Sequence, residues 1–347
     1  MTRYFVQFTA GTGGLVQDAL AARLDRLRVG YADDSAMILE SATAPSGVAA
    51  VPFLKNAFVV VLTVPRQELA KSIGRLSQSL RRDQFPRLPE SADRFRLMAH
   101  VDGGLVPIDP RARTALERAI SRHTGARLDP RGMGQEYWVV GRSGLPELLF
   151  GARLPKATRR PTPKGALSYE LAAMLVAASK PAAEDRFLDP FAGSGALVAA
   201  RAELPARTLW YSDLALEQHR RALPSSLSRR NRVRLLDEDA LTLPSIADRS
   251  IDVIVTDPPW GEHADLDGPY GDFARAVGES FARTLHPTRG RYVVLINRRN
   301  ADTMGDALAR AALPSTARHD ILVNGHPASV LLGGAVSAEG RQSGHPR

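Results

Sequence analysis

Two short loops in the C-terminal half of this 347-residue chain carry side chains suited to chemistry. One loop, TDPPWG, brings together Asp257, Pro258, Pro259 and Trp260. Because each proline fixes φ and removes an N–H donor, we expect the loop to present only acceptors, the Asp257 carboxylate and the Pro258 carbonyl. Two acceptors suit an exocyclic NH₂ group, since holding both protons frees the nitrogen lone pair for attack on an electrophile. Trp260 would supply a face on which the base stacks.

The other loop, in FLDPFAGSGAL, has the composition of a ligand-binding turn between a strand and a helix. Its candidate binding residues are Asp189, Pro190, Phe191, Ala192, Gly193, Ser194 and Gly195. The glycines let the backbone pass close to a ligand before the helix begins. A dinucleotide fold would want a small residue in place of Val198 and rarely has Asp-Pro before its glycines, which argues against a nicotinamide cofactor.

Two further acidic residues are placed to complete a nucleoside pocket. Asp213 ends the next expected strand, about 20 residues past the glycines, where a carboxylate accepts hydrogen bonds from ribose hydroxyls. Asp239, followed by Ala240, would face an adenine amine, with Asp237 and Glu238 as rival candidates. A nucleoside pocket beside an amine-binding loop predicts a methyltransferase that uses S-adenosyl-L-methionine.

Strands and helices alternate from residue 167 onward, and they would position these loops. We expect strands at 186–189, 208–212, 232–236, 251–256, 291–297, 320–323 and 329–332. We expect helices at 168–179, 196–202, 216–223, 272–285 and 301–312. Such alternation predicts an α/β fold with a doubly wound sheet, and the short gap at 324–328 predicts an antiparallel last strand. Seven strands with the last reversed is the plan of a Rossmann-like methyltransferase domain.

The N-terminal half predicts an α+β region at 1–154, built from two small units at about 1–84 and 93–154. A basic, proline-rich linker at 155–166 separates it from a catalytic domain at 167–336. Residues 337–347 form a polar, glycine-rich tail that we expect to fray.

LDPFAGSGAL and TDPPWG, with Asp213 between them, resemble the cofactor and catalytic motifs of amino-methyltransferases. RRPTPKGALSYELAAML resembles the linker and lead-in helix of the THUMP-domain RNA guanine-N2-methyltransferases. FLKNAFVVV and RLDPRGMGQEYWVVGRSGLPELLFGARLP are similar to the ferredoxin-like and THUMP units of that family. The resemblance implies a SAM-dependent methyltransferase acting on guanosine N2, with an N-terminal RNA-binding region. Ala192 and Ala196 replace the family's usual Cys and Thr, and Trp260 its usual Tyr.

The net charge of +9 and the pI of about 10.2, with arginine far more frequent than lysine, favour a polyanionic partner such as tRNA. Codon composition is the alternative source of the arginines. The candidate phosphate-binding residues are Arg81, Arg82, Arg159, Arg160, Lys164, Arg298 and Arg299. With no cysteine and no metal-ligand spacing of histidines, we expect no disulfide and no metal. No secretory signal or membrane span is evident, so a cytoplasmic location is expected.

Other functions remain open at this point. An Asp-Pro-Pro-aromatic loop serves any exocyclic amine, so adenine N6 or cytosine N4 of DNA or rRNA is an alternative target. A catalytically idle RNA-binding protein is a third hypothesis, against which the intact Asp189, Gly193, Gly195, Asp213 and Asp257 argue. The sequence does not indicate the modified position, the number of methyl groups added or the oligomeric state.

Overall fold

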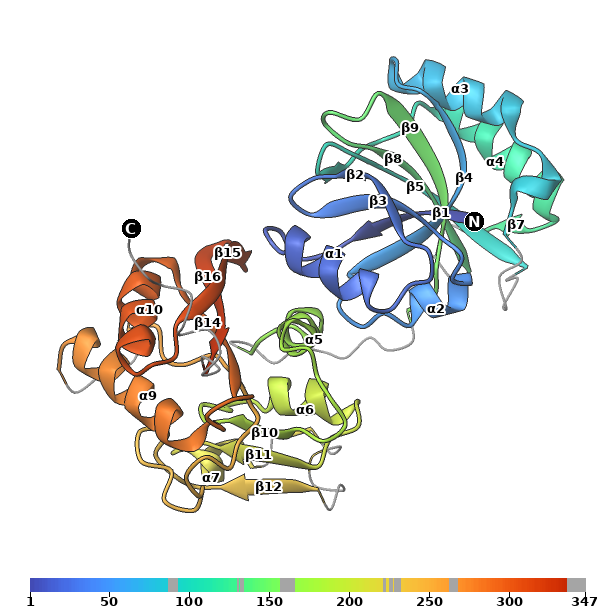
Figure 1. Ribbon diagram of the computed structural model, residues 1–347. Helices are drawn as coiled ribbons and strands as arrows, with labels where there is room; N and C mark the ends of the chain where they lie inside the picture. The colour runs from blue at the N-terminus through green and yellow to red at the C-terminus, as the bar shows by residue number, and fades with distance from the viewer. Residues whose placement is uncertain are drawn as a thin grey trace. The chain divides into compact units, whose positions relative to one another are not determined.

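The computed structural model describes residues 1–86, 93–129, 131, 134–156, 166–220, 223–224, 227, 232–261 and 268–335. The chain forms two units (Figure 1). The N-terminal unit comprises Met1–Phe8 and Leu20–Arg159, and the C-terminal unit comprises Thr9–Ala19 and Arg160–Arg347. Most of the expected linker, with Arg159, Arg160 and Lys164, lies outside the described residues, as does the expected tail at 337–347.

The described strands of the N-terminal unit form one sheet with the order β2-β3-β1-β4-β9-β8-β5-β6, with β7 beside β5. The strands are β1 (Thr2–Gln7), β2 (Arg28–Ala32), β3 (Ala36–Ser41), β4 (Asn56–Pro65), β5 (Arg94–Val101), β6 (Gly104–Leu105), β7 (Arg127–Leu128), β8 (Gln135–Gly141) and β9 (Glu147–Arg153). The helices are α2 (Pro45–Ala49), α3 (Leu69–Ser79), η1 (Arg82–Gln84) and α4 (Pro110–Thr124), while α1 (Gly13–Ala21) crosses the division between the units.

The two small units expected in this half share one sheet. The apolar, β-branched strand β4 pairs with β1 on one side and with β9 on the other, so a single sheet crosses the proposed boundary. Helix α1 ends at Ala21. The chain turns at Arg26, which has a φ of +52°, and enters β2, a strand that the sequence pattern did not indicate.

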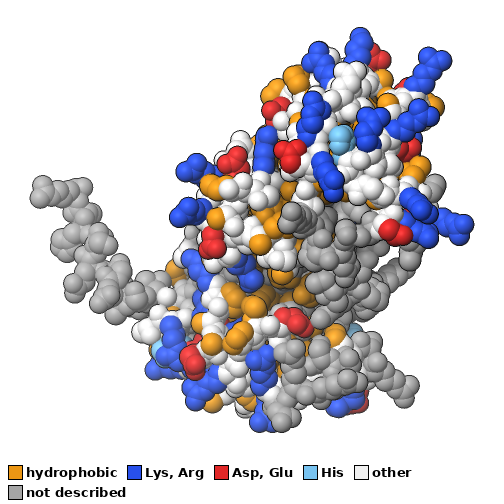
Figure 2. Space-filling model, turned by 90° about the vertical axis from the view of Figure 1, so that its right-hand side faces the viewer, with side chains coloured by type: hydrophobic (Ala, Val, Ile, Leu, Met, Phe, Trp, Pro, Cys, Tyr) orange, Lys and Arg blue, Asp and Glu red, His pale blue; other side chains and the backbone are white. Residues whose placement is uncertain are grey.

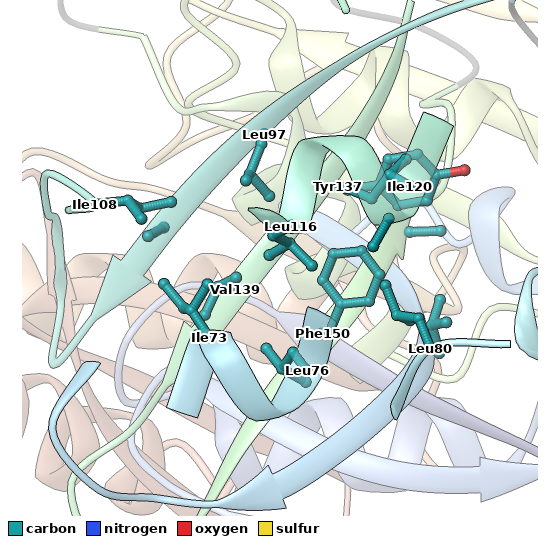
Figure 3. Packing of buried hydrophobic residues seen from close by; sticks show 14 of the residues in the cluster. Ile73, Leu76, Leu80, Leu97, Ile108, Leu116, Ile120, Tyr137, Val139 and Phe150 are labelled. Atoms are coloured by element: carbon teal, nitrogen blue, oxygen red, sulfur yellow. The ribbon is translucent and has the colours of Figure 1, made fainter. Parts of the chain in front are cut away.

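Helices α3 and α4 pack on one face of this sheet. Asp109 caps α4 by accepting hydrogen bonds from the Arg111 and Ala112 amides, and Gly125 ends the helix with a φ of +77°. Ile73 and Leu76 of α3 and Leu116 and Ile120 of α4 are buried against strand residues such as Tyr137 and Phe150 (Figure 3). This layer of two helices on a sheet therefore forms one core of the N-terminal unit, and a second buried cluster includes Phe5, Ile38 and Phe58.

The C-terminal unit has a seven-stranded sheet, counted over the described residues, with the order β12-β11-β10-β13-β14-β16-β15. Its strands are β10 (Arg186–Asp189), β11 (Thr208–Ser212), β12 (Val233–Leu236), β13 (Val253–Thr256), β14 (Arg291–Asn297), β15 (Ser315–Val323) and β16 (His326–Gly334). The first five are parallel, whereas β16 runs antiparallel to both β14 and β15. The antiparallel last strand agrees with the short turn at Asn324 and Gly325, where φ is +51° and +88°.

Helices flank this sheet on both faces. Those that the structure describes are α5 (Tyr169–Ala178), α6 (Ala196–Ala202), α7 (Leu216–His219), α9 (Tyr270–Thr284), η2 (Arg298–Asn300) and α10 (Ala301–Arg310). Val277 and Phe281 of α9 and Met304 and Leu308 of α10 are buried against strand residues such as Ile254. Helices α5 and α6 pack together and contact β14, β10 and β11 (Figure 1). The α/β architecture expected for this half is confirmed.

In the part of the chain that the structure describes, no helix has both the length and the apolar character that crossing a membrane requires.

Candidate active site

Strand order places the two chemistry-bearing loops side by side. Strand β10 lies between β11 and β13, so the chain that leaves β10 turns one way and the chain that leaves β13 turns the other. Such a switch point, at the carboxyl ends of the strands, is where open α/β sheets bind ligands. Asp189 is the last residue of β10, and Asp257 directly follows β13. Both predicted loops therefore begin at the switch point.

The glycine loop after β10 is a tight turn held by backbone hydrogen bonds. The Ala192 amide donates to the Ser212 carbonyl at 3.0 Å, and the Gly195 amide donates to the Ala192 carbonyl at 2.7 Å. Gly193 and Gly195 have φ values of +46° and +75°, a region in which a side chain is strained. A Cβ on Gly195 would lie 2.8 Å from Leu227 Cδ1, whereas a Cβ on Gly193 would meet nothing within 4 Å. Gly193 thus faces open space, which is the geometry that a ligand needs.

Asp213 fixes this turn from the end of the neighbouring strand. Its Oδ2 accepts a hydrogen bond from the Gly193 amide at 2.7 Å, and its Oδ1 accepts one from the Ala215 amide at 2.8 Å. His219 Nε2 lies 3.9 Å from the same Oδ1. The sequence assigned Asp213 to ribose binding, and the structure adds a second role, because the carboxylate also supports the glycine loop. Each oxygen keeps a lone pair for a hydroxyl donor.

Asp239 follows β12 and has one engaged oxygen. Its Oδ1 accepts the Leu241 amide at 2.9 Å, while Ala240 is buried and its carbonyl accepts the Ser280 hydroxyl at 2.7 Å. The rival Glu238 instead accepts the Ser245 amide through Oε2, at 3.2 Å. Asp237 is exposed. Asp239 and Glu238 each keep one carboxylate oxygen that can accept an amine hydrogen bond.

Asp189 is a buried carboxyl group, with 1% of the residue exposed. Its Oδ1 accepts the Thr256 hydroxyl at 2.7 Å and the Phe191 amide at 3.3 Å. Burial raises the pKa of Asp189 to about 8, although these two hydrogen bonds act in the opposite direction. The nearby Asp257 and Asp213 carboxylates raise this pKa further. Three carboxyl groups thus share one edge of the sheet, and a cationic ligand would relieve their repulsion.

The Asp-Pro-Pro-Trp loop presents acceptors, as the sequence predicts. Asp257 is partly exposed, and its Oδ1 accepts a hydrogen bond from Trp260 Nε1 at 2.8 Å. Burial raises the pKa of Asp257 to about 7, and the indole hydrogen bond moderates that rise. Within the described residues, neither the Pro258 nor the Pro259 carbonyl accepts a hydrogen bond. One carboxylate oxygen and these carbonyls therefore remain for a substrate.

Three residues that the sequence analysis did not single out contribute to this arrangement. Thr256 donates its hydroxyl to Asp189, and the Tyr211 hydroxyl donates to the Gly193 carbonyl at 2.6 Å. Asn300, at the end of η2, donates from Nδ2 to the Trp260 carbonyl at 2.7 Å. Asn300 lies just past β14, so a search for polar residues after each parallel strand would have found it. Tyr211 is buried inside β11 and gave no such signal.

The comparisons with known proteins agree with this geometry. Residues 156–223 and 224–325 match the family profile UPF0020, described as RMKL-like, methyltransferase domain. Among solved structures, the fold is similar to TrmN from Thermus thermophilus, with a TM-score of 0.72 and 19% identity over 97% of this chain and 100% of that one. SMU.472 in complex with SAH has a TM-score of 0.65 and 12% identity, over 97% and 99% of the two chains. A predicted N6-adenine-specific DNA methylase from Listeria monocytogenes has a TM-score of 0.64 and 12% identity, over 96% of each chain. Among curated proteins, none matches.

The C-terminal unit is an S-adenosylmethionine-dependent methyltransferase domain. The predicted cofactor is thereby confirmed.

The residues of the methyltransferase domain fit this cofactor. The open face of Gly193 leaves room for a ligand beside the loop backbone. Asp213 and Asp239 offer acceptors for ribose hydroxyls and an adenine amine. The acidic edge of the sheet that carries Asp189 suits the positive charges of a sulfonium and an ammonium group.

The arginines predicted to bind RNA lie in different settings. Arg81 and Arg82 are exposed at the end of α3, where Arg81 Nη1 also donates to the Gln78 and Leu80 carbonyls at 3.0 and 2.9 Å. Arg298 Nε lies 3.4 Å from Asp320 Oδ2, so part of its charge is already compensated within the methyltransferase domain. Arg299 is exposed, and its amide donates to Asn297 Oδ1 at 2.8 Å.

Proposed function

We propose that this chain is an RNA methyltransferase that modifies an exocyclic nucleobase amine, N2 of a guanosine in tRNA. The observation that carries the proposal is the Asp257 loop at the switch point. A partly exposed carboxylate with one oxygen held by Trp260 stands beside two prolines that donate no backbone hydrogen bond. An amine with two protons matches such an acceptor set, whereas a hydroxyl with one proton does not.

The role of each residue follows from this geometry. S-adenosylmethionine supplies an electrophilic methyl group when bound. Asp213 and Asp239 orient the nucleoside, and Asp257 accepts a hydrogen bond from the substrate amine. This bond draws the nitrogen lone pair out of conjugation, and the Asp257 carboxylate can take up the proton that the amine releases. A pKa near neutrality suits that exchange.

A basic surface on the N-terminal unit supports an RNA substrate. Over 68–84 and 109–124, which cover α3, η1 and α4, there are eight Lys and Arg against four Asp and Glu. The eight basic residues, all exposed, are Lys71, Arg75, Arg81, Arg82, Arg111, Arg113, Arg118 and Arg122. Many Lys and Arg side chains gather on the visible face of this unit in Figure 2. We name the eight residues listed above, from Lys71 to Arg122, the α3–α4 basic face. Exposed arginines at this density suit phosphate contacts.

One further point favours guanosine in tRNA over other amines. The linker and lead-in helix of the sequence resemble those of the THUMP-domain guanine-N2-methyltransferases. The fold resembles TrmN over 97% of this chain and 100% of that one, so the N-terminal unit is included in the likeness.

Adenine N6 is the second candidate. Its support is the structural likeness to the predicted N6-adenine-specific DNA methylase, together with an acceptor loop that accommodates any exocyclic amine. The two candidates differ in the modified base, so one measurement separates them.

The deciding experiment is mass spectrometry of nucleosides from tRNA, rRNA and DNA of a deletion strain. Loss of N2-methylguanosine from tRNA, restored by the wild-type gene and not by an Asp257→Ala variant, would support the proposal. Loss of a methylated adenine or cytosine would establish the alternative. Unchanged nucleosides in all three pools would contradict both.

RNA docking is tested by charge reversal on the α3–α4 basic face. Replacing Arg111, Arg118 and Arg122 by Glu should weaken tRNA binding at least about tenfold at moderate salt. In a plot of log binding constant against log salt concentration, the negative slope should become shallower by about 0.9 for each phosphate that the variant no longer neutralises. The matched control replaces Arg23, Arg26 and Arg28, three exposed arginines of the same unit, by Glu. Equally weakened binding in both triple variants would mean that net charge alone drives binding.

A further inference from the structure

We infer that Trp260 and Asn300 are positioning residues that hold Asp257 in its amine-accepting orientation. This inference rests on the proposed function, because it explains how the Asp257 carboxylate is held in the orientation that the substrate amine requires. It also changes the role of the aromatic residue, since the sequence alone assigned Trp260 to stacking on the base.

The first contact lies within the loop itself. The chain leaves β13 at Thr256, passes through two prolines and returns the Trp260 indole to Asp257, three residues earlier. Because Nε1 donates to Oδ1 at 2.8 Å, that oxygen is committed and the carboxylate cannot rotate without breaking the bond. Oδ2 is left as the oxygen that faces a substrate. The indole therefore selects which carboxylate oxygen accepts the amine hydrogen bond.

The second contact anchors the far end of the loop. Asn300 Nδ2 donates to the Trp260 carbonyl at 2.7 Å, and this links the loop after β13 to the start of α10. The segment that carries Asn300 is itself fixed, because the buried Asn297 accepts the Arg299 amide at 2.8 Å. Two neighbouring parallel strands thus supply one chain of hydrogen bonds, from Asn300 through Trp260 to Asp257.

Electrostatics explain why Asp257 needs a donor. Asp257 itself raises the pKa of Asp189 at the end of β10, as does Asp213 at the end of β11, so this edge of the sheet is acidic. Among the described residues, the indole N–H is the one group that donates a hydrogen bond to the Asp257 side chain. Burial raises the pKa of Asp257 and the indole bond lowers it. Removing the donor should therefore raise the pKa and protonate the acceptor at neutral pH.

The direct test needs neither RNA nor turnover. The chain has three tryptophans, so Trp138→Phe with Trp210→Phe leaves Trp260 as the sole indole. Its fluorescence should show a transition near pH 7, the pKa expected of Asp257, and added Asp257→Asn should abolish that transition. Asp248→Asn, at an exposed carboxylate on another loop, should leave it unchanged. A transition that survives Asp257→Asn, or none in the parent variant, would overturn the inference.

The second test follows single-turnover methylation against pH. Trp260→Phe keeps an aromatic ring and removes the donor. The acid limb of its rate profile should move to higher pH by about 1–2 units, the equivalent of one hydrogen bond to a charged group. Trp210→Phe, the same substitution on β11 in the same domain, should leave the profile in place. A Trp260→Phe rate that falls equally at every pH, or a raised KM with an unmoved limb, would favour stacking and contradict the inference.

The third test substitutes Asn300. Asn300→Ala should lower the maximal single-turnover rate about tenfold, with the affinity for S-adenosylmethionine unchanged by calorimetry. Asn300→Asp places an acceptor against the Trp260 carbonyl and should lower the rate further. Equal rates for both variants and the wild type would remove Asn300 from the inference. If the wild type methylates no nucleobase amine, the proposed function fails, whereas the fluorescence transition still decides whether the Trp260 indole is bonded to Asp257 and reports its titration.

Discussion

The two ends of strand β13 carry aspartates in opposite surroundings. Asp252 precedes the strand and Asp257 follows it, with four residues between them. Asp252 is buried and accepts hydrogen bonds from Arg186 Nε at 2.9 Å and Arg289 Nε at 2.7 Å. Burial alone would raise its pKa, but these arginines hold the pKa of Asp252 well below its usual range. Asp257 has an indole as its donor and a pKa raised to about 7.

The contrast between Asp252 and Asp257 distinguishes carboxylates that stabilise the fold from carboxyl groups that are available for chemistry. At the amino end of the sheet a second aspartate, Asp185, is clamped in the same way by Arg201 and Arg291, at 3.2 and 2.8 Å. A carboxylate whose oxygens are bound by two arginines is unavailable to a ligand. At the carboxyl end, Asp189 and Asp257 have no arginine partner among the described residues, so they can exchange protons and accept ligands. Substitution of Asp257 should therefore lower the methylation rate with little effect on stability, whereas substitution of Asp252 should lower stability with little effect on the rate.

The largest expected effect is on the methylation rate of Asp257→Ala. Loss of the proton acceptor should lower the single-turnover rate by about 10²–10⁴, with cofactor affinity and thermal stability nearly unchanged. Asp257→Asn keeps one acceptor oxygen but cannot take up the proton, so its single-turnover rate should be lowered by a factor in the same range. A near-normal rate in Asp257→Ala would mean that the loop is structural.

Asp252→Asn should show the reverse pattern. Breaking a buried ion pair leaves Arg186 without its counter-charge, and we expect a loss of about 3 kcal/mol in the free energy of unfolding. The rate per folded molecule should stay near that of the wild type. Since the folded-state pKa is depressed, this stabilisation is present above the usual Asp pKa and is lost as pH falls through the folded value. Denaturant unfolding at pH 7 and at lower pH measures both effects.

Asp213→Ala should mainly change cofactor affinity. The carboxylate supports the Gly193 amide and is placed for the ribose hydroxyls, so its removal should cost about 1–3 kcal/mol of S-adenosylmethionine binding. Calorimetry without RNA measures this directly. Unchanged affinity would mean that the ribose lies elsewhere.

The smallest expected effect is a pH-dependent gain of stability in Asp189→Asn. Because the folded-state pKa of Asp189 is raised to about 8, the wild type loses stability as pH rises from about 4 to 8. A neutral amide avoids this cost and can still accept from Thr256 and the Phe191 amide. We expect a gain of about 1–2 kcal/mol at pH 8, or a few degrees in Tm, that vanishes near pH 4. A gain of the same size at both pH values would contradict the raised pKa.

The sequence predicted the site where local chemistry constrains the backbone. Gly193 and Gly195 require positive φ, and consecutive prolines restrict the loop after Asp257, so both turns are readable from residue types. The Trp260–Asp257 hydrogen bond was not readable, because the side-chain direction beyond two prolines depends on how the loop packs. Strand β2 could not be predicted from the sequence, because its residues alternate between exposed and partly exposed and give no apolar pattern. Its pairing with β3 is also irregular between Val29 and Tyr31.

The pairing of β4 with β9 has a consequence for synthesis. Strand β4 ends at Pro65, while its partner β9 begins at Glu147, about 80 residues later in the chain. During translation the free edge of β4, a run of apolar residues, is made several seconds before its partner emerges, at synthesis rates of roughly 5–20 residues per second. An unpaired apolar strand edge is a template for wrong pairing. The N-terminal half must therefore wait for residue 153 before its sheet can close, and a nascent chain stalled earlier would be a natural client for chaperones.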